Sequence, residues 1–155
     1  MHIHYISEQN SILNHFLAQI RDVNIQKDSM RFRKNIERIG EIMAYELSKT
    51  LDYKEIDVQT PLGIKHTTTI AEPVVLCSIL RAGLALHQGF MSFFDNAENG
   101  FVSAYRHHYD NDDKFEILVE YQAAPSFAGK NLILIDPMLA TGQSLVAVLH
   151  KLHLE

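Results

Sequence analysis

The first third of the chain repeats apolar residues at the spacing of amphipathic helices. One helix is predicted from Ser11, and a longer one starts after Ser29 as its N-cap and runs towards Leu51. A short strand is expected at residues 1–6. The helical faces consist of Ile12, Leu13, Phe16, Leu17 and Ile20 in the first helix and of Phe32, Ile36, Ile39, Met43 and Leu47 in the second. A face as long as the second is typical of core packing or of a subunit interface.

Shorter apolar runs, typical of strands, follow from residue 56 onwards. Residues 56–60 and 64–70 flank Pro61-Leu62-Gly63, which predicts a hairpin around a tight turn. Residues 74–80 are almost wholly apolar, as in a strand that is buried on both faces. Further strands are expected at 101–105, 115–121 and 132–135, and helices at 84–93 and from Ser144 onwards.

This order of elements predicts an α/β fold with a mainly parallel sheet flanked by helices and a small β-hairpin near residues 56–70. A length of 155 residues is typical of one domain, so we expect residues 1–155 to form a single unit. The polar stretch 107–114 is predicted to be a loop, and loops of this kind often act as lids.

Composition and charge exclude several classes of protein. The net charge of −5 argues against a dedicated nucleic-acid binder, including an RNA-binding regulator, but leaves room for a local positive pocket. The single cysteine, Cys77, lies in an apolar run, which predicts an inert core thiol and a reducing compartment. The sequence shows no signal peptide and no membrane-spanning run, so we expect a cytoplasmic protein. The nine histidines do not have the spacing of a metal site.

The stretch 132–144 carries the strongest chemical signal. Four apolar residues end in Asp136, and a short loop leads through Thr141-Gly142 to Ser144, which can open a helix. Ligands of open α/β sheets bind at the carboxyl ends of strands, and a helix N-terminus attracts phosphate. The pattern therefore indicates a phosphate cradle with a carboxylate that faces sugar hydroxyls. The plain alternative is a strand-to-helix turn capped by Ser144; a Walker loop is excluded because Gly-Lys-Ser/Thr is absent.

Two arginines stand at the ends of other predicted strands. Arg81 follows the apolar run and precedes Ala82-Gly83, small residues that allow a ligand to approach the backbone. Arg106 ends the strand before the polar loop. For each arginine taken alone, the simpler interpretation is a charged side chain exposed to solvent. Together with Asp136 they form three charged strand ends, and a guanidinium matches the geometry of phosphate oxygens, so we predict that they converge on one anion.

These motifs resemble those of the uracil phosphoribosyltransferase family, within the type I phosphoribosyltransferase fold. The likeness extends from about Ser29 to the end of the chain. Its motifs are Phe32-Arg33, Ile39-Gly40, Tyr45-Glu46, Thr60-Pro61-Leu62-Gly63-Ile64, Ile79-Leu80-Arg81-Ala82-Gly83-Leu84, Tyr105-Arg106 and Asp136-Pro137-Met138-Leu139-Ala140-Thr141-Gly142. Pro137 is a mark of the uracil branch, because other members of the fold have a second acid there.

The resemblance implies transfer of a phosphoribosyl group from 5-phosphoribosyl 1-pyrophosphate to uracil, giving UMP and pyrophosphate. Mg²⁺ is expected through the substrate, with no metal ligand from the protein. Asp136 would bind the ribose hydroxyls, residues 138–144 the 5-phosphate, and Arg81 and Arg106 the pyrophosphate; these two arginines and Asp136 are the implied catalytic residues. The implied substrate-binding residues are Arg81, Ala82, Gly83, Arg106, Asp136, Pro137, Met138, Leu139, Ala140, Thr141, Gly142, Gln143 and Ser144. A non-proline cis peptide is implied in the first loop, at Arg81-Ala82.

The chain departs from the family pattern at three places. Gln143 stands where glycine is common, and Ser78 replaces the usual proline. No Pro-Gly-Leu-Gly-Asp type stretch, the family's uracil-binding segment, is present, so we expect a C-terminally short domain with no residue assigned to uracil. The alternative function is a non-catalytic remnant that binds phosphoribosyl pyrophosphate or oligomerises. In either case we expect a homodimer or higher homo-oligomer, with no nucleic-acid or membrane partner.

Overall fold

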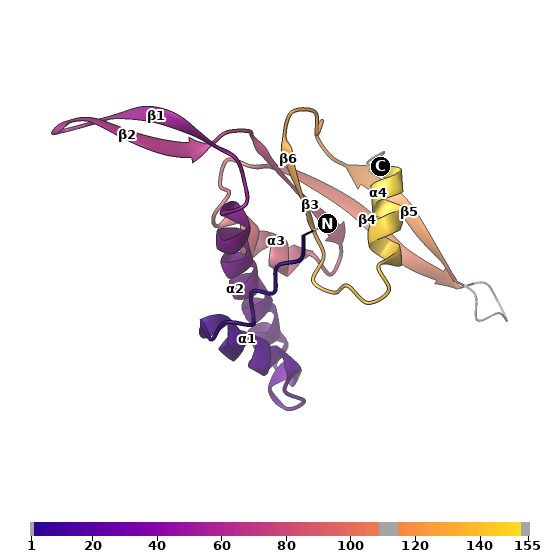
Figure 1. Ribbon diagram of the computed structural model, residues 1–155. Coiled ribbons are helices and arrows are strands. Elements are labelled where there is room, and N and C mark those ends of the chain that lie inside the picture. The colour runs from indigo at the N-terminus through magenta and orange to yellow at the C-terminus, as the bar shows by residue number, and fades with distance from the viewer. Residues whose placement is uncertain (1, 109–114, 153–155) are drawn as a thin grey trace.

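The computed structural model describes residues 2–108 and 115–152, with side chains described outside 105–118. Its helices are α1 (Ile12–Arg21), α2 (Ser29–Ser48), α3 (Leu84–Met91) and α4 (Gln143–Lys151), with a 3₁₀ turn η1 (Ile25–Lys27) between the first two. Its strands are β1 (Tyr53–Thr60), β2 (Gly63–Ile70), β3 (Val74–Leu80), β4 (Glu98–His108), β5 (Phe115–Ala123) and β6 (Asn131–Ile135). Figure 1 shows the hairpin β1–β2 projecting from a body built around the other four strands.

The four-stranded sheet has the order β5-β4-β3-β6. β3 runs parallel to both of its neighbours, and β5 pairs with β4 in the antiparallel direction. The prediction of a mainly parallel sheet is therefore confirmed. β4 is longer than expected, because its pairing with β5 continues to His108; residues 109–114 of the predicted polar loop lie outside the described residues.

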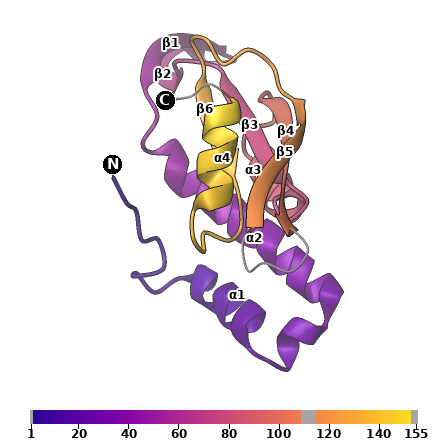
Figure 2. The ribbon, with the colours of Figure 1, turned by 90° about the vertical axis from the view of Figure 1, so that its right-hand side faces the viewer.

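Helices cover both faces of this sheet (Figure 2). Alternate residues of β3 point to opposite sides: Val74 and Leu76 pack with α1, α2 and α3, whereas Cys77 and Ile79 pack with α4. This arrangement buries the apolar run from both sides, as the sequence predicted. Burial also raises the pKa of the Cys77 thiol to about 11, so the thiol stays protonated and unreactive.

The hairpin forms where it was predicted. Its strands are joined by Pro61-Leu62, and Gly63 adopts a φ of 136° that favours glycine. The Thr60 hydroxyl donates to the Gly63 carbonyl over 2.7 Å and accepts from the Leu62 N–H over 3.2 Å, which closes the turn. Leu62 is fully exposed at the tip.

The N-terminal segment and the start of α2 correct two predictions. No strand forms at residues 2–5, because this segment has no partner strand among the described residues and lies instead beside α2. Ser11 is the N-cap of α1. The cap of α2 is Asp28 rather than Ser29, and its carboxylate accepts from the Arg31 N–H over 3.1 Å. Ser29 is the first helical residue. Serine and aspartate are both good caps, so the sequence did not distinguish two adjacent candidates.

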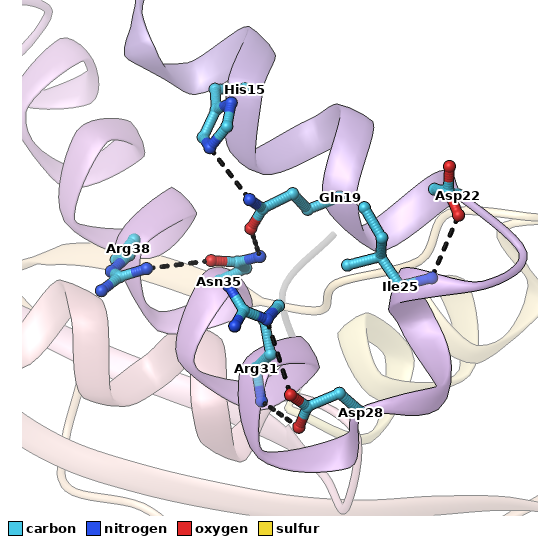
Figure 3. Close-up of polar contacts among 8 residues, drawn as sticks. All are labelled: His15, Gln19, Asp22, Ile25, Asp28, Arg31, Asn35 and Arg38. Carbon is cyan, nitrogen blue, oxygen red and sulfur yellow. Dashed lines mark hydrogen bonds and ion pairs between the residues drawn. The ribbon is translucent and has the colours of Figure 1, made fainter.

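A chain of hydrogen bonds joins α1 to α2 (Figure 3). Arg38 Nη1 donates to Asn35 Oδ1 over 3.2 Å, and Asn35 Nδ2 donates to Gln19 Oε1 over 2.7 Å. The Gln19 nitrogen then faces His15 Nε2 at 2.9 Å, so the ring nitrogen accepts. Because a guanidinium can only donate, Arg38 determines the direction of the whole chain. Asn35 is fully buried, and this network satisfies its amide within the helix pair.

Helices α2 and α3 cross in direct backbone contact. A Cβ atom added to Gly40 would lie 2.5 Å from the Leu86 carbonyl oxygen, and one added to Gly89 would lie 2.1 Å from the Glu37 carbonyl oxygen. The apolar face of α2 is therefore used in the core: Ile36, Ile39, Met43 and Leu47 all pack against it. The sequence allowed two uses of this face, core packing or a subunit interface, and these four residues serve core packing.

We predict that Gly89→Ala destabilises the fold by about 2 kcal/mol or more, because the new methyl group forces the two helices apart. Urea denaturation measures the change. Gln88→Ala, an exposed change in the same helix, is the matched control and should stay within about 0.5 kcal/mol of the wild type. Equal stability of both variants would contradict the close crossing.

His87 makes stability depend on pH. The residue is buried in α3, its Nε2 lies 2.8 Å from Asn99 Oδ1, and its Nδ1 has no partner among the described residues. Burial lowers the pKa of His87 from its ordinary value of 6.5, while the bond to Asn99 opposes this shift. The unfolded chain therefore takes up the proton first as the pH falls below 6.5, and the folded state loses stability.

We expect the urea midpoint to fall between about pH 8 and about pH 5, and His87→Gln to remove part of that fall. The exposed His2 supplies a matched control, since His2→Gln should leave the fall unchanged. An identical fall in His87→Gln and the wild type would assign the acid sensitivity to other groups.

Candidate functional site

The first candidate loop connects β3 to α3. It contains a cis peptide bond between Leu80 and Arg81, in the loop where the resemblance implied one but one bond before Arg81-Ala82. Arg81 and Ala82 are exposed, whereas Gly83 is buried at the start of α3. The Gly83 N–H donates to the Ile79 carbonyl over 3.0 Å, which closes the loop into a tight turn.

Gly83 packs closely against the protein on the side where a side chain would lie. A Cβ atom at this position would lie 2.3 Å from Ser78 Oγ, 2.8 Å from the Ile79 carbonyl oxygen and 2.9 Å from the Ile135 carbonyl oxygen. The side of Gly83 where a side chain would point is thus filled by the protein, because β6, which is distant in sequence, lies directly beside the loop. That Ala82 and Gly83 let a ligand approach the backbone stays a prediction.

The second candidate loop connects β6 to α4. Asp136 directly follows β6, is half-buried, and its Oδ1 accepts from the Met138 N–H over 3.3 Å. Gly142 is the N-cap of α4 and has a φ of 76°. Ser144 is the second helical residue, so the plain alternative, in which Ser144 caps the helix, is wrong about the cap. The left-handed turn at Gly142 starts the helix one residue earlier than expected.

Gln143, which stands where the family commonly has glycine, adopts helical geometry as the first residue of α4. Its N–H donates to Thr141 Oγ1 over 3.4 Å, and its side-chain oxygen accepts from the same hydroxyl over 3.3 Å. The left-handed conformation falls on Gly142 instead, so Gln143 fits this backbone without a positive φ.

A cavity of about 100 Å³ lies inside this second loop. The first turn of α4 borders it, and the first N–H groups of a helix have no acceptor within the helix, which suits an anion. The lining residues are Asp136, Met138, Leu139, Ala140, Thr141, Gly142, Ser144 and Leu145. Pro137 and Gln143, which the sequence analysis included, do not line it.

The two loops are neighbours because their strands are adjacent and parallel. Ser78 of β3 pairs with Ile135 of β6, so Arg81 and Asp136 follow the same edge of the sheet. Arg106 lies on β4, beyond Ser103, which pairs with Leu80. Its backbone therefore lies towards the same edge, but its side chain is outside the described part.

Two further findings concern the described residues. They contain no group of three or more His, Cys, Asp or Glu that could hold a metal ion. None of their helices is long and apolar enough to cross a bilayer.

Sequence reasoning missed the contact among Ser78, Gly83 and Ile135. The small residues at positions 78 and 83 were a signal, but their common neighbour is a backbone carbonyl, which every residue carries. Only the pairing of β3 with β6 identifies which carbonyl that is.

The fold is that of the phosphoribosyltransferases. The structure of a hypoxanthine phosphoribosyltransferase from Staphylococcus aureus superposes with a TM-score of 0.53 over 78% of this chain and 56% of that chain, at 16% identity. A protein of Aquifex aeolicus with a solved structure is closer, with a TM-score of 0.78 and 30% identity over 93% of this chain and 67% of that one.

The sequence pattern that defines the uracil phosphoribosyltransferases matches residues 6–155. The uracil phosphoribosyltransferase of Porphyromonas gingivalis is 49% identical over 145 residues, which are 94% of this chain and 67% of that protein. That of Methanothermobacter thermautotrophicus is 37% identical, over 92% of this chain and 65% of its own length. The chain therefore belongs to the uracil phosphoribosyltransferase family, and it spans about two thirds of the length of these relatives.

The left-handed turn at Gly142 gives a prediction about stability. A Cβ atom there would meet nothing closer than 3.8 Å, so Gly142→Ala costs backbone strain alone, about 1 kcal/mol. Gly142→Asn should cost less, because asparagine tolerates this conformation. Thermal denaturation measures both, with Gln143→Ala as the helical control. If Gly142→Asn is destabilised as much as Gly142→Ala, the left-handed turn is not the cause.

Proposed function

We propose that this protein binds 5-phosphoribosyl 1-pyrophosphate and transfers the phosphoribosyl group to uracil, releasing pyrophosphate and forming UMP. One observation carries the proposal: loops 81–83 and 136–144 follow adjacent parallel strands and meet through the contact of Gly83 with Ile135. Such an edge suits a ligand with phosphate at both ends and a sugar between them. Family membership supplies the substrate class.

The loop 138–144 is the proposed site of the 5-phosphate. Its cavity opens at the first turn of α4, where free N–H groups and the helix dipole favour negative charge. Thr141 and Ser144 add hydroxyl groups at the same place. We assign no cation from the protein to this phosphate.

Asp136 is the proposed partner of the ribose hydroxyls. Its Oδ1 accepts from the Met138 N–H, which orients the carboxylate at the mouth of the loop. Breaking the bond between sugar and pyrophosphate builds positive charge on the ribose, and a nearby carboxylate stabilises that charge. This interaction strengthens as the charge develops, so it lowers the barrier rather than only binding the substrate.

Arg81 and Arg106 are the proposed partners of the pyrophosphate. Arg81 is exposed at the end of β3, and the backbone of Arg106 follows the adjacent strand. The leaving group gains negative charge as the bond breaks, and guanidinium groups that are already in position stabilise it. Little covalent chemistry is required of the protein, so positioning provides much of the rate.

Mg²⁺ fits the proposed substrate better than it fits the protein alone. The described residues offer Asp136 but no cluster of ligands, and Mg²⁺ commonly combines one or two carboxylates with substrate phosphates. When bound, the ion would neutralise charge on the pyrophosphate. Arg81 then acts on the remaining charge of the same group.

The partners of the proposed reaction are phosphoribosyl pyrophosphate and uracil, and we expect neither nucleic acid nor a membrane. We also propose a single domain that acts in the cytoplasm as a homodimer or higher homo-oligomer. Support for self-association comes from the family and from the exposed apolar side chains of the hairpin, Val58, Leu62 and Ile64. Sedimentation as a monomer would contradict it.

A second candidate function is binding of phosphoribosyl pyrophosphate without transfer. One observation favours it: loops 81–83 and 136–144 lie at one edge of the sheet and account for the sugar pyrophosphate, whereas none of the described residues is assigned to uracil. UMP formation from uracil, phosphoribosyl pyrophosphate and Mg²⁺ distinguishes the two. UMP above background supports the enzyme, whereas binding of the sugar pyrophosphate without UMP supports the binding protein.

We predict that Arg81→Ala weakens binding of phosphoribosyl pyrophosphate about tenfold or more, because a charge-assisted contact to the anion is lost. Stability should not change, since the side chain is exposed. Calorimetric titration measures the affinity. Lys65→Ala, an equal charge change on the exposed hairpin, is the control and should leave the affinity unaltered. Equal affinities for both variants would remove Arg81 from the site.

A further inference from the structure

Ser78 is a buried polar residue whose hydroxyl forms no hydrogen bond among the described residues. It lies on β3, between Phe101 of β4 and Ile135 of β6 in the sheet register. Because the hydroxyl has no partner, it contributes volume rather than a polar contact at this position. What that volume touches is the backbone of Gly83.

Three atoms surround the position that a side chain of Gly83 would occupy: Ser78 Oγ, the Ile79 carbonyl oxygen and the Ile135 carbonyl oxygen. Ile135 directly precedes Asp136, so Gly83 lies against the end of the strand that carries the second loop. The space under Gly83 therefore determines how closely the loop of Arg81 approaches the loop of Asp136.

We propose that Ser78 is a positioning residue whose small side chain allows Gly83 to bring the two halves of the site together. This inference rests on the proposed binding of phosphoribosyl pyrophosphate across both loops. A larger side chain at position 78 must displace a neighbour. β3 is held by ladders on both sides, whereas Arg81 and Ala82 are exposed, so the loop is the part that yields.

This displacement has a specific consequence for ligands. Phosphoribosyl pyrophosphate engages both loops, so its affinity depends on their separation. Ribose 5-phosphate lacks the pyrophosphate and engages residues 136–144 alone, so its affinity does not. A variant that only weakens the fold would not distinguish the two ligands.

The test compares the affinities of both ligands for Ser78→Thr, which adds one methyl group, by calorimetric titration of the full chain. We expect about tenfold weaker binding of phosphoribosyl pyrophosphate and a change of less than about twofold for ribose 5-phosphate. Val75→Ile is the matched control: it overfills the same buried strand at its other end, and both affinities should stay at the wild-type values. Thermal denaturation of each variant reports stability separately.

Ser78→Ala provides a second variant that removes an unpartnered atom and therefore folds. It should keep both affinities, because the Ile79 and Ile135 carbonyl oxygens and the hydrogen bond from the Gly83 N–H to Ile79 still hold the turn, and no larger side chain displaces it. Loss of phosphoribosyl pyrophosphate affinity in Ser78→Ala, or equal changes for the two ligands in Ser78→Thr, would overturn the inference and leave the proposed function intact. Failure of the wild-type chain to bind phosphoribosyl pyrophosphate would overturn both.

Discussion

The packing of Gly83 against the ends of β3 and β6 is the contact on which the candidate site depends. Three atoms lie within 3 Å of the space that any side chain at position 83 would fill, so the turn after β3 can close only with glycine there. The closed turn places the first loop beside Asp136. The chemistry proposed for the site therefore follows from a steric constraint of the backbone, with charge added by residues that the constraint leaves exposed.

The remainder of the fold keeps those two strands in place. β3 is paired on both sides and buried on both faces, which leaves the sheet little freedom to shift. On one face, the backbone crossing of Gly40 with Gly89 holds α3 against α2, and α3 begins at the candidate loop. On the other face, α4 lies against β4 and β5, its Val148 belongs to the same buried cluster as Cys77, and α4 begins at the end of loop 136–142. Each loop is thus anchored by its own helix.

Local patterns allowed much of this fold to be predicted. The apolar run of β3, the Pro-Leu-Gly turn of the hairpin and the abrupt change from β6 to Asp136 each predict an element that the structure contains. The predictions that failed did so for one of two reasons. Either two adjacent residues were equally suited to the same role, or the role depended on a contact with a residue distant in sequence. Asp28 and Ser29 are both good caps, and their order is decided by one hydrogen bond. The role of Gly83 depends on a strand far along the chain, and no local pattern reports that contact.

Every role proposed for the site requires that a sugar pyrophosphate binds across loops 81–83 and 136–144. Titration of the isotope-labelled chain with phosphoribosyl pyrophosphate, followed by the backbone amide signals of both loops, tests it most directly. If the ligand spans both loops, the largest shifts fall on these two loops together and saturate with one affinity. Shifts confined to other parts of the molecule, or to one loop alone, would contradict it.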